Sequence, residues 1–217
     1  MHIEFLVEDS SGSELLNILL PQLLGPKYQP HTWDLKTFQG IGKLPKNLNA
    51  VPDPKKKTLL DNLPLRLKAY GKSHGFDAVV VVLDLDNENY KKFSDELMEV
   101  AHKCAPNLLT IFNLAIEETE AWYLGDQPAV LKAYPHAKRS VLSSYKQDTA
   151  CGTWELLADA VHPGGSKAIK KAGWPLPGQI KHKWAENIGK LMTLDKNESP
   201  SFNAFRDGMR QLAARTP

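Results

Sequence analysis

The hydrophobic pattern of the first 115 residues alternates between short apolar runs and longer segments with helical periodicity. The short runs, which predict strands, are His2–Val7 and residues 31–38, 78–83 and 108–114. Leucines recur at three- and four-residue intervals between Leu15 and Leu24, and amphipathic helices are also predicted over residues 58–72 and 87–103. The run 78–83 is apolar at every position, which is typical of a central strand in a parallel sheet with helices on both faces.

The repeated order of strand and helix predicts an α/β fold with a Rossmann-like parallel sheet, right-handed crossovers and flanking helices. After Glu117 the pattern changes to helices and turns without strong strands. Helices are expected over Glu120–Leu124 and residues 128–133, 153–160, 166–172, 180–192 and 201–213. We therefore predict an α/β domain over residues 1–126 and a helical, basic C-terminal extension over residues 127–217 that packs on it.

These two parts of the chain differ in charge. Residues 1–126 carry 13 Lys and Arg against 18 Asp and Glu, whereas residues 127–217 carry 14 against 7. An acidic part that holds a cation beside a basic part that holds phosphate suits a metal-dependent enzyme acting on nucleic acid; the alternative is chance asymmetry. The candidate contacts to nucleic acid are Lys55, Lys56, Lys167, Lys170, Lys181 and Lys183. For the lysines at 55–57, a solvated turn is the alternative interpretation.

The rest of the composition argues against a disulfide-rich, a zinc-binding or a membrane-spanning protein. Apolar residues make up 42% of the chain and charged residues 24%, as in ordinary globular proteins. Two cysteines without CxxC spacing argue against a disulfide framework and a zinc site. Without an export signal or a run near the ~20 apolar residues that span a bilayer, we expect a cytoplasmic protein that does not contact membranes.

Acidic residues follow three of the predicted strands. Glu8 ends the first, Asp84 and Asp86 end the third, and an acidic stretch that includes Glu117 and Glu120 follows the fourth. Ligands of open α/β sheets bind at these carboxyl ends. Crowded carboxylates repel one another unless a cation offsets them, and hard oxygen ligands favour Mg²⁺ or Mn²⁺. The alternatives are a turn formed by the aspartates and a solvated first helical turn formed by the glutamates.

Aromatic and histidine side chains occur among the lysines of the basic part. Trp154, Trp174 and Trp184 are candidates for stacking on bases, but we expect them in the core because tryptophan buries a large apolar area. His162 and His182 are likewise expected to be structural.

Six short motifs occur in order along nearly the whole chain: FLVEDSSGSELL at 5–16, QGIG at 39–42, VLDLD at 82–86, EAWYLGD at 120–126, TW at 153–154 and SPSF at 199–202. Together they resemble a bacterial TOPRIM-like family of unassigned function, related to the TOPRIM domains of OLD-type nucleases. The resemblance implies a metal site at Glu8, Asp84 and Asp86, and nucleic-acid cleavage in partnership with an ATPase encoded nearby. The common TOPRIM turn has glycine after the glutamate, whereas here Asp9 follows Glu8.

The predicted function is a divalent-metal-dependent nuclease that cleaves phosphodiester bonds of DNA or RNA. Asp84 and Asp86 would hold the ion, Glu8 would act as a ligand or general base, and Glu117 or, preferably, Glu120 would complete a second metal position. The alternative is a non-catalytic nucleic-acid-binding or regulatory subunit of an ATPase complex, since the chain has no GxxxxGK[ST] motif of its own. A phosphatase with Asp84 as nucleophile is disfavoured because Asn87 stands where that chemistry usually has threonine. The oligomeric state is left open.

Overall fold

The computed structural model of the protein describes residues 1–148 and 152–215. Within these residues, four parallel strands form a single sheet in the order β2-β1-β3-β4. Their bounds are His2–Val7 for β1, Thr32–Thr37 for β2, Ala78–Asp84 for β3 and Leu109–Ala115 for β4. The predicted parallel α/β fold is confirmed, and β1 has its predicted bounds.

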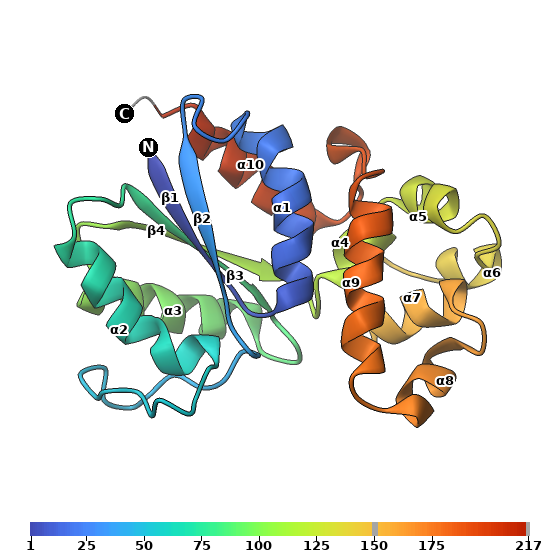
Figure 1. Cartoon of the computed structure of the whole chain (residues 1–217), viewed down its shortest axis with the longest axis horizontal. Helices are drawn as coiled ribbons and strands as arrows, with labels where there is room; N and C mark the ends of the chain where they lie inside the picture. The colour runs from blue at the N-terminus through green and yellow to red at the C-terminus, as the bar shows by residue number, and fades with distance from the viewer. Residues whose placement is uncertain (149–151, 216–217) are drawn as a thin grey trace.

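Helices cover both faces of the sheet (Figure 1). Helices α1 (Ser10–Leu24) and α10 (Pro200–Ala213) pack on one face, and α2 (Leu59–Lys72) and α3 (Tyr90–Cys104) pack on the other. Successive strand residues point to opposite faces, so Val80 joins the first core and Val81 the second. Burial on both faces explains why β3 is apolar along its length.

The other helices gather beyond the end of β4 (Figure 1). They are α4 (Glu120–Leu124), α5 (Gln127–Ala133), α6 (Arg139–Leu142), α7 (Thr153–Val161), α8 (Gly165–Ala172), α9 (Leu176–Gly189) and the 3₁₀ helix η1 (Leu194–Lys196). The predicted helical C-terminal part is confirmed, although α6 and η1 are too short for periodicity to reveal. Helix α9 begins four residues before the predicted start, because Pro177 is tolerated in a first helical turn.

Two of the sequence motifs connect the end of the chain to the rest of the fold. The amide of Asn197 donates to the carbonyl of Trp122 over 2.8 Å, and the indole of Trp122 stacks on Phe205 of α10 with 4.9 Å between ring centroids. A side chain at Gly125 would collide with Asn197 and Ser199. One hydrophobic core therefore runs through both parts of the chain, and the domain boundary at residue 126 stays a prediction.

None of the helices in the described residues combines the length and the hydropathy that a bilayer-spanning segment needs. The cytoplasmic location stays a prediction.

Candidate functional site

The centre of the sheet is where its strand order reverses. From β1 the chain moves to β2 on one side and then returns to β3 on the other side of β1. Glu8 follows β1, Asp84 is the last residue of β3, and the backbone N–H of Asp84 donates to Oε2 of Glu8 over 3.0 Å. The structure thus brings two of the predicted site residues together at the point where open α/β sheets bind ligands.

The two aspartates of the DxD sequence differ in their surroundings. Oδ1 of Asp84 accepts hydrogen bonds from the backbone N–H (3.0 Å) and the hydroxyl (3.3 Å) of Thr119. Asp86 has a positive φ of 48° and an exposed side chain, and its backbone N–H donates to the carbonyl of Glu117 over 2.9 Å. The turn therefore directs Asp84 into the site and leaves Asp86 at its solvent side.

Glu117 has a local structural task. Its φ is also positive, at 61°, and its carboxylate caps the start of α7 by accepting the backbone N–H groups of Gly152 and Thr153, the latter over 2.7 Å. A carboxylate at a helix N-terminus is stabilised by the helix dipole. Each oxygen of Glu117 accepts one N–H in this cap, so the cap holds its carboxylate at the start of α7.

Lys181 of α9 reaches the acidic residues from the C-terminal part of the chain. Its Nζ lies 3.1 Å from Oε1 of Glu118 and 3.3 Å from Oε2 of Glu120, and 18% of its side chain is exposed. The sequence suggested Lys181 only as a nucleic-acid contact and assigned no role to Glu118. No local spacing links residues 61 and 63 positions apart, so sequence patterns could not have revealed this pair.

Burial governs the protonation of this group, which we call the carboxylate cluster: Glu8, Asp84, Glu118, Glu120 and Lys181. Desolvation raises the pKa of Glu8 to about 7, and nearby acidic side chains add to the shift. Desolvation also raises the pKa of Glu118 to about 7, with a further contribution from Glu120.

Burial and neighbouring charges also shift the pKa values of the other members of the carboxylate cluster. Burial, together with the charges of Glu8 and Glu120, raises the pKa of Asp84 well above its ordinary value, and burial raises that of Glu120. Burial alone would lower the pKa of Lys181, but the surrounding carboxylates raise it, so this lysine stays charged. The cluster therefore has four carboxyl groups around one ammonium.

The donor set fits a hard divalent cation. Glu8 uses Oε2 and Asp84 uses Oδ1 in the hydrogen bonds above, so an ion would bind their second oxygens, and carboxylate oxygens suit Mg²⁺ or Mn²⁺. Among the described residues, however, the three side chains whose ligand atoms lie within 4.8 Å of one another are His2, Glu4 and Asp34, at the amino ends of β1 and β2. Simultaneous binding by Glu8, Asp84 and Asp86 requires their side chains to rotate.

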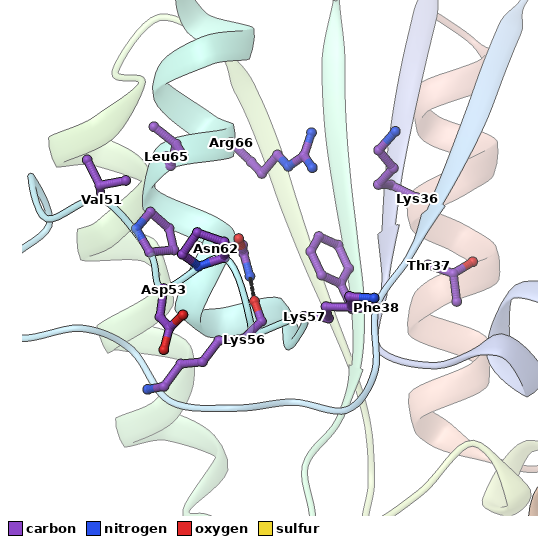
Figure 2. A pocket seen from close by; sticks show the side chains of 12 residues that line it. Lys36, Thr37, Phe38, Val51, Asp53, Lys56, Lys57, Asn62, Leu65 and Arg66 are labelled. Atoms are coloured by element: carbon purple, nitrogen blue, oxygen red, sulfur yellow. Dashed lines mark hydrogen bonds between the residues drawn. The ribbon is translucent and has the colours of Figure 1, made fainter.

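The other predicted nucleic-acid contacts lie outside the carboxylate cluster. Lys56 pairs with Asp61 over 2.8 Å and lines a hollow of about 360 Å³ beside α2, together with Lys36 and Arg66 (Figure 2). Lys55 is exposed on the same loop.

In the C-terminal part, Lys170 pairs with Glu155 over 2.8 Å and lies over the ring of Trp154, 5.2 Å from its centroid. Lys167 and Lys183 are exposed. Contact between these lysines and nucleic acid stays a prediction.

Comparisons with known proteins identify a family but no activity. A protein-family model described as a domain of unknown function (DUF4276) matches residues 7–210, a range that contains the whole carboxylate cluster. No curated protein and no solved structure matches the chain.

Proposed function

The chain belongs to the DUF4276 family, and we propose that it is a divalent-metal-dependent nuclease that cleaves phosphodiester bonds of DNA or RNA. The observation that carries this proposal is the meeting of Glu8 and Asp84 in a partly buried group of carboxylates at the switch point of the sheet. Residues with strongly perturbed pKa values gather at functional sites. The resemblance of the glutamate and DxD positions to TOPRIM domains supports nucleic acid as the substrate.

In this proposal Glu8, Asp84 and Asp86 hold Mg²⁺ or Mn²⁺, and Glu120 is the candidate for a second position. The bound ion would polarise the scissile phosphate and stabilise the charge that develops on it. Glu8 has an alternative role as general base: when it is not bound to the ion, burial raises its pKa to about 7, which suits proton transfer from an attacking water near neutral pH. Lys181 positions Glu118 and Glu120 through its two ion pairs.

One observation favours the second candidate, a non-catalytic nucleic-acid-binding or regulatory subunit of an ATPase complex. Lys181 already supplies an internal cation to the carboxylates, so the cluster can fold without a metal. In that case the acidic end of the sheet would serve recognition, and an ATPase encoded nearby would perform any hydrolysis.

Cleavage assays separate the two candidates. The purified chain is incubated with supercoiled plasmid, single-stranded DNA or RNA, in Mg²⁺, Mn²⁺ or EDTA. We expect metal-dependent cleavage that Glu8→Gln and Asp84→Asn each reduce by at least ~100-fold, because both remove a charged ligand while keeping the side-chain shape.

The matched control is Glu99→Gln, which neutralises an exposed glutamate of α3 that pairs with Lys103 on the same helix. This variant should cleave like the wild type. Cleavage that survives in both site variants, with their folding verified by circular dichroism, would contradict the nuclease mechanism. Binding without cleavage in every metal would favour the subunit.

A further inference from the structure

Trp174 has an exposed ring, whereas Trp33, Trp122 and Trp184 are buried and Trp154 is partly buried. Its exposed fraction is 83%, whereas Trp122 and Trp184 are 0% and 2% exposed. It lies between α8 and α9, and its six-membered ring passes 3.1 Å from the position that a Cβ would occupy at Gly178. The expectation that this tryptophan is buried is therefore wrong, because it sits in a connection and not on the packed side of a helix.

The Trp174 ring borders a hollow between α9 and the start of α1. The hollow measures about 470 Å³, and its lining includes Ser10, His182 and Lys183. A hydrogen bond of 2.7 Å between His182 Nε2 and Ser10 Oγ connects α9 to the start of α1. Ser10 begins α1 two residues after Glu8, so the hollow reaches the turn that carries this glutamate.

A second hollow lies beside the turn that follows Asp84. It measures about 550 Å³, is lined by Asp86 and Lys92, and is bounded by residues 41–44 and the start of α3. The first hollow adjoins α9 and the start of α1, whereas the second adjoins α2 and α3, which cover the opposite face of the sheet from α1. A site with room on both sides suits a polymer that passes through better than a mononucleotide.

The charge around Trp174 suits the backbone of such a polymer. Lys171 lies in the last turn of α8, just before this tryptophan, and Lys183 lines the same hollow together with one acidic residue, Glu186. Residues 127–217 carry twice as many basic as acidic residues. An exposed aromatic ring among cations is how proteins hold single-stranded nucleic acid, because every unpaired base offers a π-face.

We propose that Trp174 stacks on an unpaired base of a single-stranded nucleic acid, and that the strand continues past Ser10 to the carboxylate cluster. Cleavage of the bound nucleic acid rests on the proposed function, whereas its binding at Trp174 does not. Bases inside a duplex are already stacked on each other, so the ring selects single strands.

The test measures binding without metal, so that cleavage cannot interfere. Labelled oligo(dT), oligo(U) and a blunt-ended DNA duplex are titrated in EDTA with fluorescence anisotropy as the readout. Trp174→Ala should weaken binding of at least one single strand by about tenfold, and Trp174→Phe, which keeps a stacking ring, should recover most of it. Duplex binding should change little.

Tyr28→Ala is the control, since Tyr28 is 72% exposed in the connection before β2, at the opposite end of the sheet. It should bind like the wild type. Tryptophan fluorescence gives a second readout: oligonucleotide should quench the wild type and not Trp174→Phe.

Equal affinity of wild type and Trp174→Ala would overturn the inference, as would absent binding of both single strands or an equal loss with the duplex. If Trp174→Ala weakens binding but no metal supports cleavage, only the nuclease proposal fails. If Asp84-dependent cleavage is found but Trp174→Ala binds normally, only this inference fails.

Discussion

Two groups of charged side chains lie at opposite ends of the same sheet, and their charges are neutralised in different ways. At the amino end, each group has its own neutralising or polar partner. Nδ1 of His2 lies 2.7 Å from the Thr32 hydroxyl, and Lys27 lies 3.1 Å from Asp34. There, the carboxylate of Glu4 accepts a 2.8 Å hydrogen bond from the hydroxyl of Tyr70.

At the carboxyl end, one ammonium serves several carboxylates. Lys181 contacts both Glu118 and Glu120, while Glu8 and Asp84 have backbone donors near them. Desolvation raises the pKa of each of these four carboxyls. The difference teaches that geometric closeness of ligands and electrostatic demand for a cation are separate properties: the amino end has the first, and the carboxyl end has the second.

The largest expected effect comes from removing the shared ammonium. Lys181→Met should lower the free energy of unfolding by roughly 3 to 5 kcal/mol at pH 8, because it leaves the buried Glu120 and the partly buried Glu118 without their counter-charge. The deficit should shrink at pH 6, where these carboxyls take up protons. Urea unfolding of the variant and the wild type at both pH values measures this difference in the free energy of unfolding.

The matched control at the amino end is Lys27→Met, which removes the partner of the exposed Asp34 carboxylate. Exposed ion pairs contribute about 1 kcal/mol or less, so this variant should stay close to the wild type. Similar losses in the two variants would remove the contrast between the two ends.

For each single carboxyl, a somewhat smaller effect is expected from pH in metal-free buffer. Glu8 and Glu118 have pKa values of about 7 in the folded chain, above the ordinary 4.5, so the folded state binds their protons more tightly. Their contribution to stability is complete below pH 4.5 and is lost as the pH rises to about 7. Each carboxyl contributes about 3 kcal/mol to this fall if it titrates alone.

The measurement is denaturant unfolding between pH 5 and 8 for the wild type, Glu8→Gln and Glu99→Gln. The first variant should flatten the slope, and the second should leave it unchanged. A wild-type stability that rises across this interval would contradict the raised pKa values.

The smallest expected effect is stabilisation by a bound metal ion, which distinguishes the two ends of the sheet. At a Mg²⁺ or Mn²⁺ concentration about ten times its dissociation constant, the folded chain should gain ~1.4 kcal/mol. Asp84→Asn should lose this gain, whereas Asp34→Asn should keep it. The reverse result in thermal unfolding would place the ion at the amino end, with His2, Glu4 and Asp34.

Local patterns predicted most of the fold because strands and helices bury repeating faces. The apolar run of β3 required a sheet covered on both sides, and the strand order placed Glu8 beside Asp84. The same patterns could not separate Asp84 from Asp86, because the turn at Asp86 combines a positive φ with a hydrogen bond to the backbone of Glu117, a residue distant in the sequence.

By itself, the sequence determined the elements of the sheet, the helical character of the C-terminal part and the positions of the acidic residues after the strands. Only the tertiary structure decided that Lys181 neutralises Glu118 and Glu120, that Glu117 caps α7, and that Trp174 is exposed while Trp184 is buried. The physical reason is the distance along the chain over which each effect acts. Periodicity and turn chemistry act over a few residues, whereas charge pairing and burial depend on which distant segments the packed helices bring together.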